Sequence, residues 1–287
     1  MKLIKYFLQF LIIIFFFIIF KILGYKKSSD LGAYIFSKLG HLFRSKKVLN
    51  QNLRNINLSE ANNNYKKFIN KIWANYGRIF ADYTSIIDFR KNNLEKFITV
   101  EGADILKKIK TDNKPVIFIS GHFNNFELMA MIIEKNGINL SAIYRPLNNI
   151  FLNKVMERIR KNYICKNQIK KGLSGSRDML KAFKDGSSIA IMIDQRVSEG
   201  KKIPFFDKMA LTTTIPAQFV KRFNCKIIPV HIERYKNYHF KVSFYKPFEF
   251  SDINNLDEIT LQLNSWLEKK IIKNPTQWIW THNRWKL

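Results

Sequence analysis

The chain has 287 residues, enough for one large domain or two small ones with a buried core. Hydrophobic residues make up 46% of it and 25 residues are phenylalanine, so the composition excludes a disordered protein. The formal net charge of +27 predicts a polyanionic partner (a nucleic acid, an anionic lipid surface or a phosphorylated substrate), or else a generally basic, solvated surface. Cys165 and Cys225 are far apart in the sequence and neither lies in a CxxC pair, so no disulfide framework or zinc site is expected.

An apolar segment dominates the N-terminus. Between Lys5 and Lys21 the sequence reads YFLQFLIIIFFFIIF, which as a helix would rise about 22 Å. Apolar flanks and snorkelling lysines extend it toward the roughly 30 Å thickness of a hydrocarbon core. A signal peptide is the alternative, but LGYKKSSD follows without a small-residue cleavage site. Residues 1–25 are therefore expected to form an uncleaved transmembrane helix.

Basic residues flank this segment unequally. Lys2 and Lys5 precede it, whereas a larger group follows it: Lys26, Lys27, Lys38, Arg44, Lys46 and Lys47. The positive-inside rule then predicts a single-pass protein of the inner (cytoplasmic) membrane whose body faces the cytoplasm.

Periodicity divides the rest of the chain into two parts. Apolar residues recur at helical spacing as far as residue 87, which predicts two or three helices in a region covering 26–97. Over 98–287 strands and helices alternate. Strands are expected at 115–120, 138–143, 188–194, 225–232 and 239–245, and helices at 124–135, 151–161, 175–184, 212–223 and 256–272. This pattern predicts an α/β fold with a central, mostly parallel sheet flanked by helices, so that 26–287 form one domain behind the anchor.

His122 and Glu127 lie in GHFNNFELMA (121–130), where a predicted strand passes into a helix. On one helix this spacing would separate the side chains by about 140°, so they can meet only if His122 precedes the helix. A carboxylate behind an imidazole fixes its tautomer, and the amides of a helix start keep the imidazole neutral and can bind an oxyanion. The pattern predicts a general base, His122, oriented by Glu127. For an arbitrary H-x4-E pair, a strand end followed by a solvated helix residue is the more common interpretation.

Other residues suit an anionic substrate. Arg145 and Arg158 can bind phosphate or carboxylate bidentately, although an ordinary salt bridge is the alternative for each. Asp194 ends a predicted buried strand, where ligand sites of α/β proteins gather, or else it caps the next turn.

Thr212 to Thr214 are expected to cap a helix rather than act as nucleophiles. Core packing or a membrane-interface belt is expected for Trp278, Trp280 and Trp285.

Five ordered segments resemble the lipid A late acyltransferases, the lauroyl and myristoyl transferases. GHFNNFE is similar to the family's H-x4-D/E motif in its Glu-bearing form. The other segments are AIYRPLNN with the following ERIRKN, then IMIDQR, IPFFDKMALTTTIPAQFVKR and WIWTHNRWK. The match spans essentially the whole chain, including the N-terminal anchor, and its five ordered segments make the resemblance far more specific than the histidine–glutamate pair alone.

The resemblance implies an O-acyltransferase of lipid A (lipopolysaccharide) biosynthesis. It would move a fatty acyl chain directly from acyl carrier protein to a hydroxyl of a lipid A precursor, an anionic glycolipid, without a cofactor. It implies His122 and Glu127 as catalytic residues. The substrate-binding residues that it implies, together with Arg145, are Arg158 or its neighbour Arg160, Asp194, and Gln195 in the Asp-Gln strand end.

Two departures leave the acceptor open. Asp207 stands where the family usually has glycine, and Asn148 where aspartate is common. Another glycolipid or a lysophospholipid is therefore an alternative acceptor. A non-catalytic basic membrane scaffold is a further alternative, but it has no use for a base at a strand-to-helix turn.

Other classes fit less well. GLSGS (172–176) lacks the register of a nucleophile elbow, which disfavours a serine esterase. His231 and Glu233 form an H-x-E without the P-C-x-x-C of a zinc deaminase. No helix-turn-helix, zinc-finger or RNP pattern is present, so nucleic acid is not an expected partner.

Overall fold

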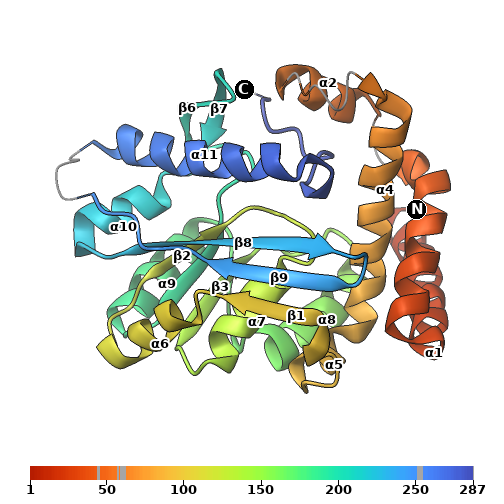
Figure 1. The fold of residues 1–287 in the computed structure, drawn as a ribbon, viewed down its shortest axis with the longest axis horizontal. Coiled ribbons are helices and arrows are strands. Elements are labelled where there is room, and N and C mark those ends of the chain that lie inside the picture. The colour runs from red at the N-terminus through yellow and green to blue at the C-terminus, as the bar shows by residue number, and fades with distance from the viewer. Residues whose placement is uncertain (44–45, 57, 59–62, 251–254, 287) are drawn as a thin grey trace.

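The computed structural model describes residues 1–43, 46–56, 58, 63–250 and 255–286. Arg44, one of the basic residues after the apolar segment, lies outside them. Within the described part, the body of the protein is a seven-stranded sheet between two layers of helices, with a two-stranded sheet beside it (Figure 1).

The central sheet has the strand order β1-β9-β8-β2-β5-β3-β4. Its strands are β1 (Ile98–Glu101), β2 (Ile117–Ser120), β3 (Leu140–Tyr144), β4 (Asn167–Lys170), β5 (Ser188–Met192), β8 (Ile227–Tyr235) and β9 (His239–Phe244). β8 and β9 pair antiparallel and all other neighbours pair parallel, which confirms the predicted mostly parallel sheet. β2 lies in the middle and all of its residues are buried, as its continuous apolar run predicts.

Helices cover both faces of this sheet (Figure 1). One face carries α9 (Leu173–Lys184), α10 (Ile215–Phe223) and α11 (Leu256–Lys273). The core on this face also includes side chains of α2 (Lys46–Ile56) and α4 (Tyr65–Asp82), which stand at one end of the sheet (Figure 1). The other face carries α5 (Ile86–Arg90), α6 (Ala103–Asp112), α7 (Glu127–Lys135) and α8 (Ile150–Ile159), which continues as a π-helical turn, η3 (Arg160–Ile164). Side chains alternate along a strand, so Ile117 and Ile119 of β2 enter one core while Phe118 enters the other.

Three short parts of the sheet structure were not predicted. β1 and β4 each have only four residues and partly exposed side chains, so they lack a continuous apolar run. The hairpin of β6 (Lys201–Phe205) and β7 (Lys208–Thr212) turns at Phe206 and Asp207, which have positive φ angles of 51° and 57°. Tight two-residue hairpin turns require such angles, and Asp207 occupies one of them.

The N-terminal helix α1 (Lys2–Phe43) is bent at Gly24, where φ is 73°. Among the described residues, α1 is the one helix that is long and apolar enough to cross a membrane. Its most apolar stretch has a mean hydropathy of 2.6, and only 6% of that stretch is buried. Beyond the bend α1 packs on α4, where Gly32 and Gly77 meet. A Cβ atom on Gly32 would lie 2.4 Å from the Gly77 carbonyl oxygen, so these two helices approach closely because neither residue has a side chain.

Candidate active site

His122 lies in the loop between β2 and α7. The predicted helix from residue 124 begins instead at Glu127, because Asn124 adopts a left-handed conformation with φ of 43° that no helix residue has. The Phe123 amide donates to the Gly121 carbonyl at 2.8 Å and closes a tight turn around the histidine. Residues 121–126 therefore present His122 at the carboxyl end of the central strand.

Asp194 is the carboxylate that contacts His122. His122 Nδ1 lies 2.7 Å from Asp194 Oδ1, and the His122 backbone amide donates to Asp194 Oδ2 at 2.6 Å. β2 and β5 are parallel neighbours, and Ser120 pairs with Met192 at their carboxyl ends. His122 and Asp194 each lie two residues further along, so they lie side by side at the same edge of the sheet. The predicted location of Asp194 at a strand end is thus confirmed, and its neighbour is the imidazole.

Asp194 is held as an anion. Its side chain is fully buried. In addition to the two bonds from His122, the carboxylate accepts a third hydrogen bond, from the Trp278 indole Nε1 to Oδ2 at 2.8 Å. Burial by itself would raise the pKa of Asp194, but the charge and hydrogen bonds of His122, together with the Trp278 bond, hold that pKa below its usual value. A carboxylate in this state fixes the imidazole with its proton on Nδ1 and its lone pair on Nε2.

Glu127 has different partners from the predicted one. Its Oε1 accepts hydrogen bonds from Arg160 Nε at 2.8 Å, from Arg160 Nη2 at 2.7 Å and from the Tyr83 hydroxyl at 3.0 Å. No hydrogen bond or ion pair joins Glu127 to His122 within the described residues. The predicted contact between Glu127 and His122 is therefore not formed in this structure, and Asp194 is the carboxylate that bonds His122 Nδ1. Glu127 is the first residue of α7, and its side chain instead contacts Arg160 at the start of η3.

Arg160 is held in place by its ion pair with Glu127 and by an aromatic ring. Only 11% of its side chain is exposed, against 9% for that of Glu127, and its guanidinium lies 5.7 Å from the centre of the Tyr144 ring. Burial disfavours the guanidinium charge, but Glu127 and Tyr83 hold the pKa of Arg160 above its usual value. Burial, followed by the charge of Glu127, raises the pKa of Tyr83, so this hydroxyl stays protonated and donates.

The remaining predicted substrate residues separate into two groups. Gln195 lies at the imidazole, with Nε2 at 3.4 Å from His122 Nε2. Arg145 and Arg158 are exposed, and neither forms a hydrogen bond or ion pair with another described residue. The sequence did not show which of Arg158 and Arg160 corresponds to the substrate arginine of the family. In the structure the two differ: Arg160 faces inward and contacts Glu127, whereas Arg158 is exposed on α8.

Two contact residues were missed by sequence reasoning. Trp278 belongs to the C-terminal tryptophan group, and its indole N–H reaches the Asp194 carboxylate from a distant segment. Tyr83 had no signal of its own, because it follows α4 in a segment recognised only by its helical spacing. All three closing tryptophans are buried, as core packing predicts: Trp278, Trp280 and Trp285.

The threonine block is structural. Thr214 is the N-cap residue of α10 as expected, although its side chain makes no capping bond, and Thr212 Oγ1 accepts from Arg284 Nη2 at 2.7 Å. Among the described residues, no group of three or more histidine, cysteine, aspartate and glutamate side chains is placed to hold a metal ion.

Comparison with known proteins adds the family. A lipid A biosynthesis acyltransferase of Haemophilus influenzae is 29% identical over 205 residues, 68% of this chain and 62% of the relative. A lipid A biosynthesis palmitoleoyltransferase of Escherichia coli is 27% identical over 202 residues, 68% of this chain and 63% of the relative. The matched part therefore spans less than two thirds of the length of these relatives.

A solved structure and a family model complete the comparison. The crystal structure of the 1-acyl-sn-glycerophosphate acyltransferase PlsC from Thermotoga maritima aligns with a TM-score of 0.42 at 14% identity, over 88% of this chain and 96% of that one. The model of the family described as bacterial lipid A biosynthesis acyltransferase matches residues 1–287. The chain belongs to the bacterial lipid A biosynthesis acyltransferase family.

Proposed function

We propose that this protein is an O-acyltransferase of lipid A biosynthesis that uses His122 as a general base. The observation that carries the proposal is the fixed imidazole: Nδ1 is bound to buried Asp194, and Nε2 is left for a substrate hydroxyl. Family membership supplies the reaction class. Asp194 takes the orienting role that the sequence assigned to Glu127.

The chemistry follows from the tautomer. Nδ1–H donates to the Asp194 carboxylate, so the Nε2 lone pair accepts the proton of the acceptor hydroxyl as its oxygen attacks the thioester carbonyl. The new ester C–O bond forms, the C–S bond breaks, and the proton on Nε2 passes to the leaving thiolate. Asp194 stabilises the imidazolium between these two steps. General-base assistance of this kind contributes about 10²–10⁴-fold to a rate.

The acceptor hydroxyl would bind beside Gln195. The Gln195 amide nitrogen lies 3.4 Å from Nε2, at the outer limit of a hydrogen bond, and a hydroxyl that enters between them would be bound by both groups. The start of α7 directly follows this loop, and the positive end of its helix dipole would stabilise the oxyanion there.

The arginines divide their work in this proposal. Arg160 is committed to Glu127 and keeps the start of α7 in place. Exposed Arg145 and Arg158 lie at the two ends of the segment that contains α8, and they are free to bind phosphates of the acceptor bidentately. Glu127 would therefore act on the reaction through Arg160 and α7, without touching the reacting atoms.

The partners and location rest on family and composition. Acyl carrier protein is the proposed acyl donor and a lipid A precursor the proposed acceptor. The relatives are named for lipid A biosynthesis, and the net charge of +27 suits an acidic protein and a phosphorylated glycolipid. α1 would anchor the protein as a single span in the inner membrane. The basic residues after the apolar segment favour a cytoplasmic catalytic domain.

The test uses purified full-length protein in detergent with acyl-loaded acyl carrier protein and a lipid A precursor. Mass spectrometry of the glycolipid is expected to show one added acyl group with the wild type and none with His122→Ala. His41→Ala, which removes a half-buried imidazole from α1, serves as the control and should transfer normally. Transfer by His122→Ala at the wild-type rate would exclude the base. Acylation of a lysophospholipid in place of the lipid A precursor would instead correct the acceptor.

A further inference from the structure

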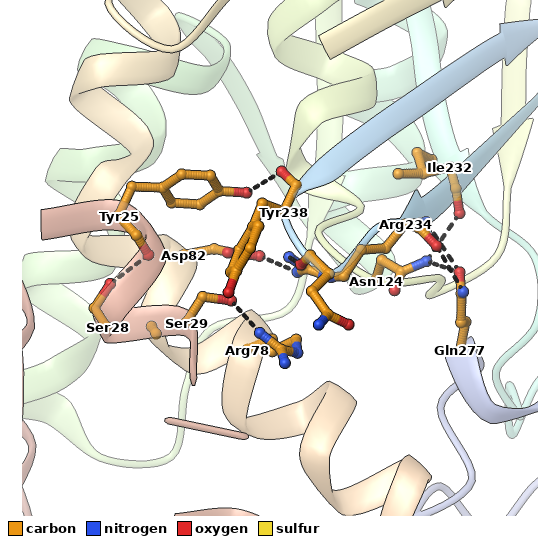
Figure 2. A network of polar contacts seen from close by, with 12 residues as sticks. Tyr25, Ser28, Ser29, Arg78, Asp82, Asn124, Ile232, Arg234, Tyr238 and Gln277 are labelled. Carbon is orange, nitrogen blue, oxygen red and sulfur yellow. Dashed lines mark hydrogen bonds and ion pairs between the residues drawn. The ribbon is translucent and has the colours of Figure 1, made fainter. Parts of the chain in front are cut away.

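Asn124 is tied down at the middle of the catalytic loop. It is completely buried and holds a left-handed conformation, which asparagine tolerates better than most residues. Its side-chain Nδ2 donates to Gln277 Oε1 at 2.6 Å and to the Ile232 carbonyl at 3.1 Å, and its backbone amide donates to the Gln277 carbonyl at 3.1 Å (Figure 2). Three hydrogen bonds therefore fix a residue that lies two positions after His122.

Gln277 is itself fixed to β8. Its Oε1 accepts from the Arg234 backbone amide at 3.0 Å, and its Nε2 donates to the Arg234 carbonyl at 2.9 Å, so the side chain pairs with the strand as a further strand residue would. The next residue, Trp278, donates to Asp194. One short segment, 277–278, thus holds both the loop that carries His122 and the carboxylate that the imidazole contacts.

The same strand position is braced by a buried ion pair. The Arg234 guanidinium binds the Asp82 carboxylate (Figure 2). It also lies 4.3 Å from the centre of the Phe240 ring and donates to the Asn237 carbonyl at 3.2 Å. Side-chain exposure is 5% for Arg234 and 0% for Asp82. Tyr83, which follows Asp82, donates to Glu127 at the other end of the loop. The end of α4 therefore supports the catalytic loop from both sides.

We propose that the Asn124 side chain is a positioning residue for acyl transfer, which, held by Gln277 and Ile232, keeps the loop in the conformation that sets His122 against Asp194. The inference rests on the proposed function of His122. Glycine would adopt the same backbone angle with less strain but would lose two hydrogen bonds and regain conformational freedom. The side chain thus supplies rigidity, which a residue with the right φ alone does not.

Asn124→Gly separates these two contributions. It keeps the left-handed conformation accessible and removes only the side-chain bonds. We expect kcat to fall about 10- to 100-fold with KM little changed, because a displacement of about 1 Å at a catalytic group costs on that order. Asn113→Gly is the matched control: Asn113 is exposed, ends α6 and has a φ of 48°, so its replacement should leave kcat unchanged.

Gln277→Ala tests the clamp, by which we mean the hydrogen bonds of Asn124 Nδ2 to Gln277 and Ile232, without changing a residue of the loop. It should lower kcat as Asn124→Gly does, and the losses should be less than additive in the double variant, because both single variants remove the hydrogen bond from Asn124 Nδ2 to Gln277 Oε1. This second variant also decides the matter should Asn124→Gly fail to fold. Additive losses in the double variant, or a wild-type kcat in either single variant, would overturn the proposal.

A spectroscopic readout keeps the clamp separate from the reaction. In ligand-free protein, the His122 Nδ1 proton bound to Asp194 should give a downfield proton NMR signal, assigned by its absence in His122→Ala. The signal should broaden or shift in Asn124→Gly and persist in Asn113→Gly. If His122→Ala still transfers acyl groups, the proposed function fails, while this signal still reports on the clamp. A signal identical to wild type in Asn124→Gly would overturn the clamp whatever the activity.

Discussion

Two carboxylates flank the catalytic loop, and their surroundings differ. Asp194 is fully buried and accepts from an amide, an imidazole and an indole, none of which carries a fixed charge. Glu127 is almost as buried but is bound by the permanent charge of Arg160 and by the Tyr83 hydroxyl. Asp194 therefore remains available to stabilise an imidazolium, whereas the charge of Glu127 is already compensated. Proximity in sequence favoured Glu127 as the partner of His122, but the hydrogen-bond partners assign that role to Asp194.

The largest difference between the carboxylates should appear in Asp194→Asn. The neutral amide cannot hold the proton on Nδ1 or stabilise the imidazolium, so we expect kcat to fall about 10³–10⁴-fold with the fold retained. Acyl transfer to the lipid A precursor would be followed by mass spectrometry. Asp185→Asn, an exposed aspartate at the end of α9, is the control and should be silent. A loss of less than tenfold in Asp194→Asn would show that the imidazole does not depend on this carboxylate.

Glu127→Gln should have a smaller effect on rate and a larger one on stability. It leaves the buried Arg160 without a counter-charge, which should destabilise the protein on the order of 3 kcal/mol, while kcat falls about 10- to 100-fold through movement of α7. Thermal unfolding in detergent measures the first and steady-state kinetics the second.

A double variant sharpens this point. Glu127→Gln combined with Arg160→Gln removes both charges and should recover most of the lost stability, because no unpaired charge stays buried. If Glu127→Gln instead matched Asp194→Asn in kcat at unchanged stability, Glu127 would belong to the reaction itself.

The smallest effect concerns His231, whose pKa no carboxylate of the described residues perturbs. Burial, followed by the nearby charges of Lys270, Lys273 and Lys241, lowers the pKa of His231 to about 3. A histidine whose folded pKa lies below its unfolded value contributes full stability above pH 6.5 and loses it as the pH falls, by up to about 1.4 kcal/mol per pH unit. The temperature of half-unfolding should therefore decrease as the pH is lowered from 7 to 5. His231→Leu should make this decrease with pH smaller. An unchanged slope would mean that other groups cause the acid sensitivity.

Much of the fold followed from patterns within single segments. The apolar N-terminal run, the buried strand at 115–120 and the periodic helices are each local signals, and the structure contains an element at every one of these places. The loop that carries His122 was recognised because a strand pattern gives way to a helix pattern there. Its left-handed Asn124 was not, since asparagine occurs in many conformations and nothing in the sequence marks this one.

The tertiary structure decided which residues His122 and Glu127 contact. His122 meets Asp194 because β2 lies beside β5 in parallel register, and this neighbourhood is set by strand order, which periodicity along the chain does not record. Glu127 meets Arg160 because α7 and η3 pack on the same face of the sheet. The sequence by itself determined that the segment at 115–120 is a buried strand and that a histidine follows it. Which carboxylate orients it depended on long-range packing, because only packing brings distant segments within hydrogen-bond distance.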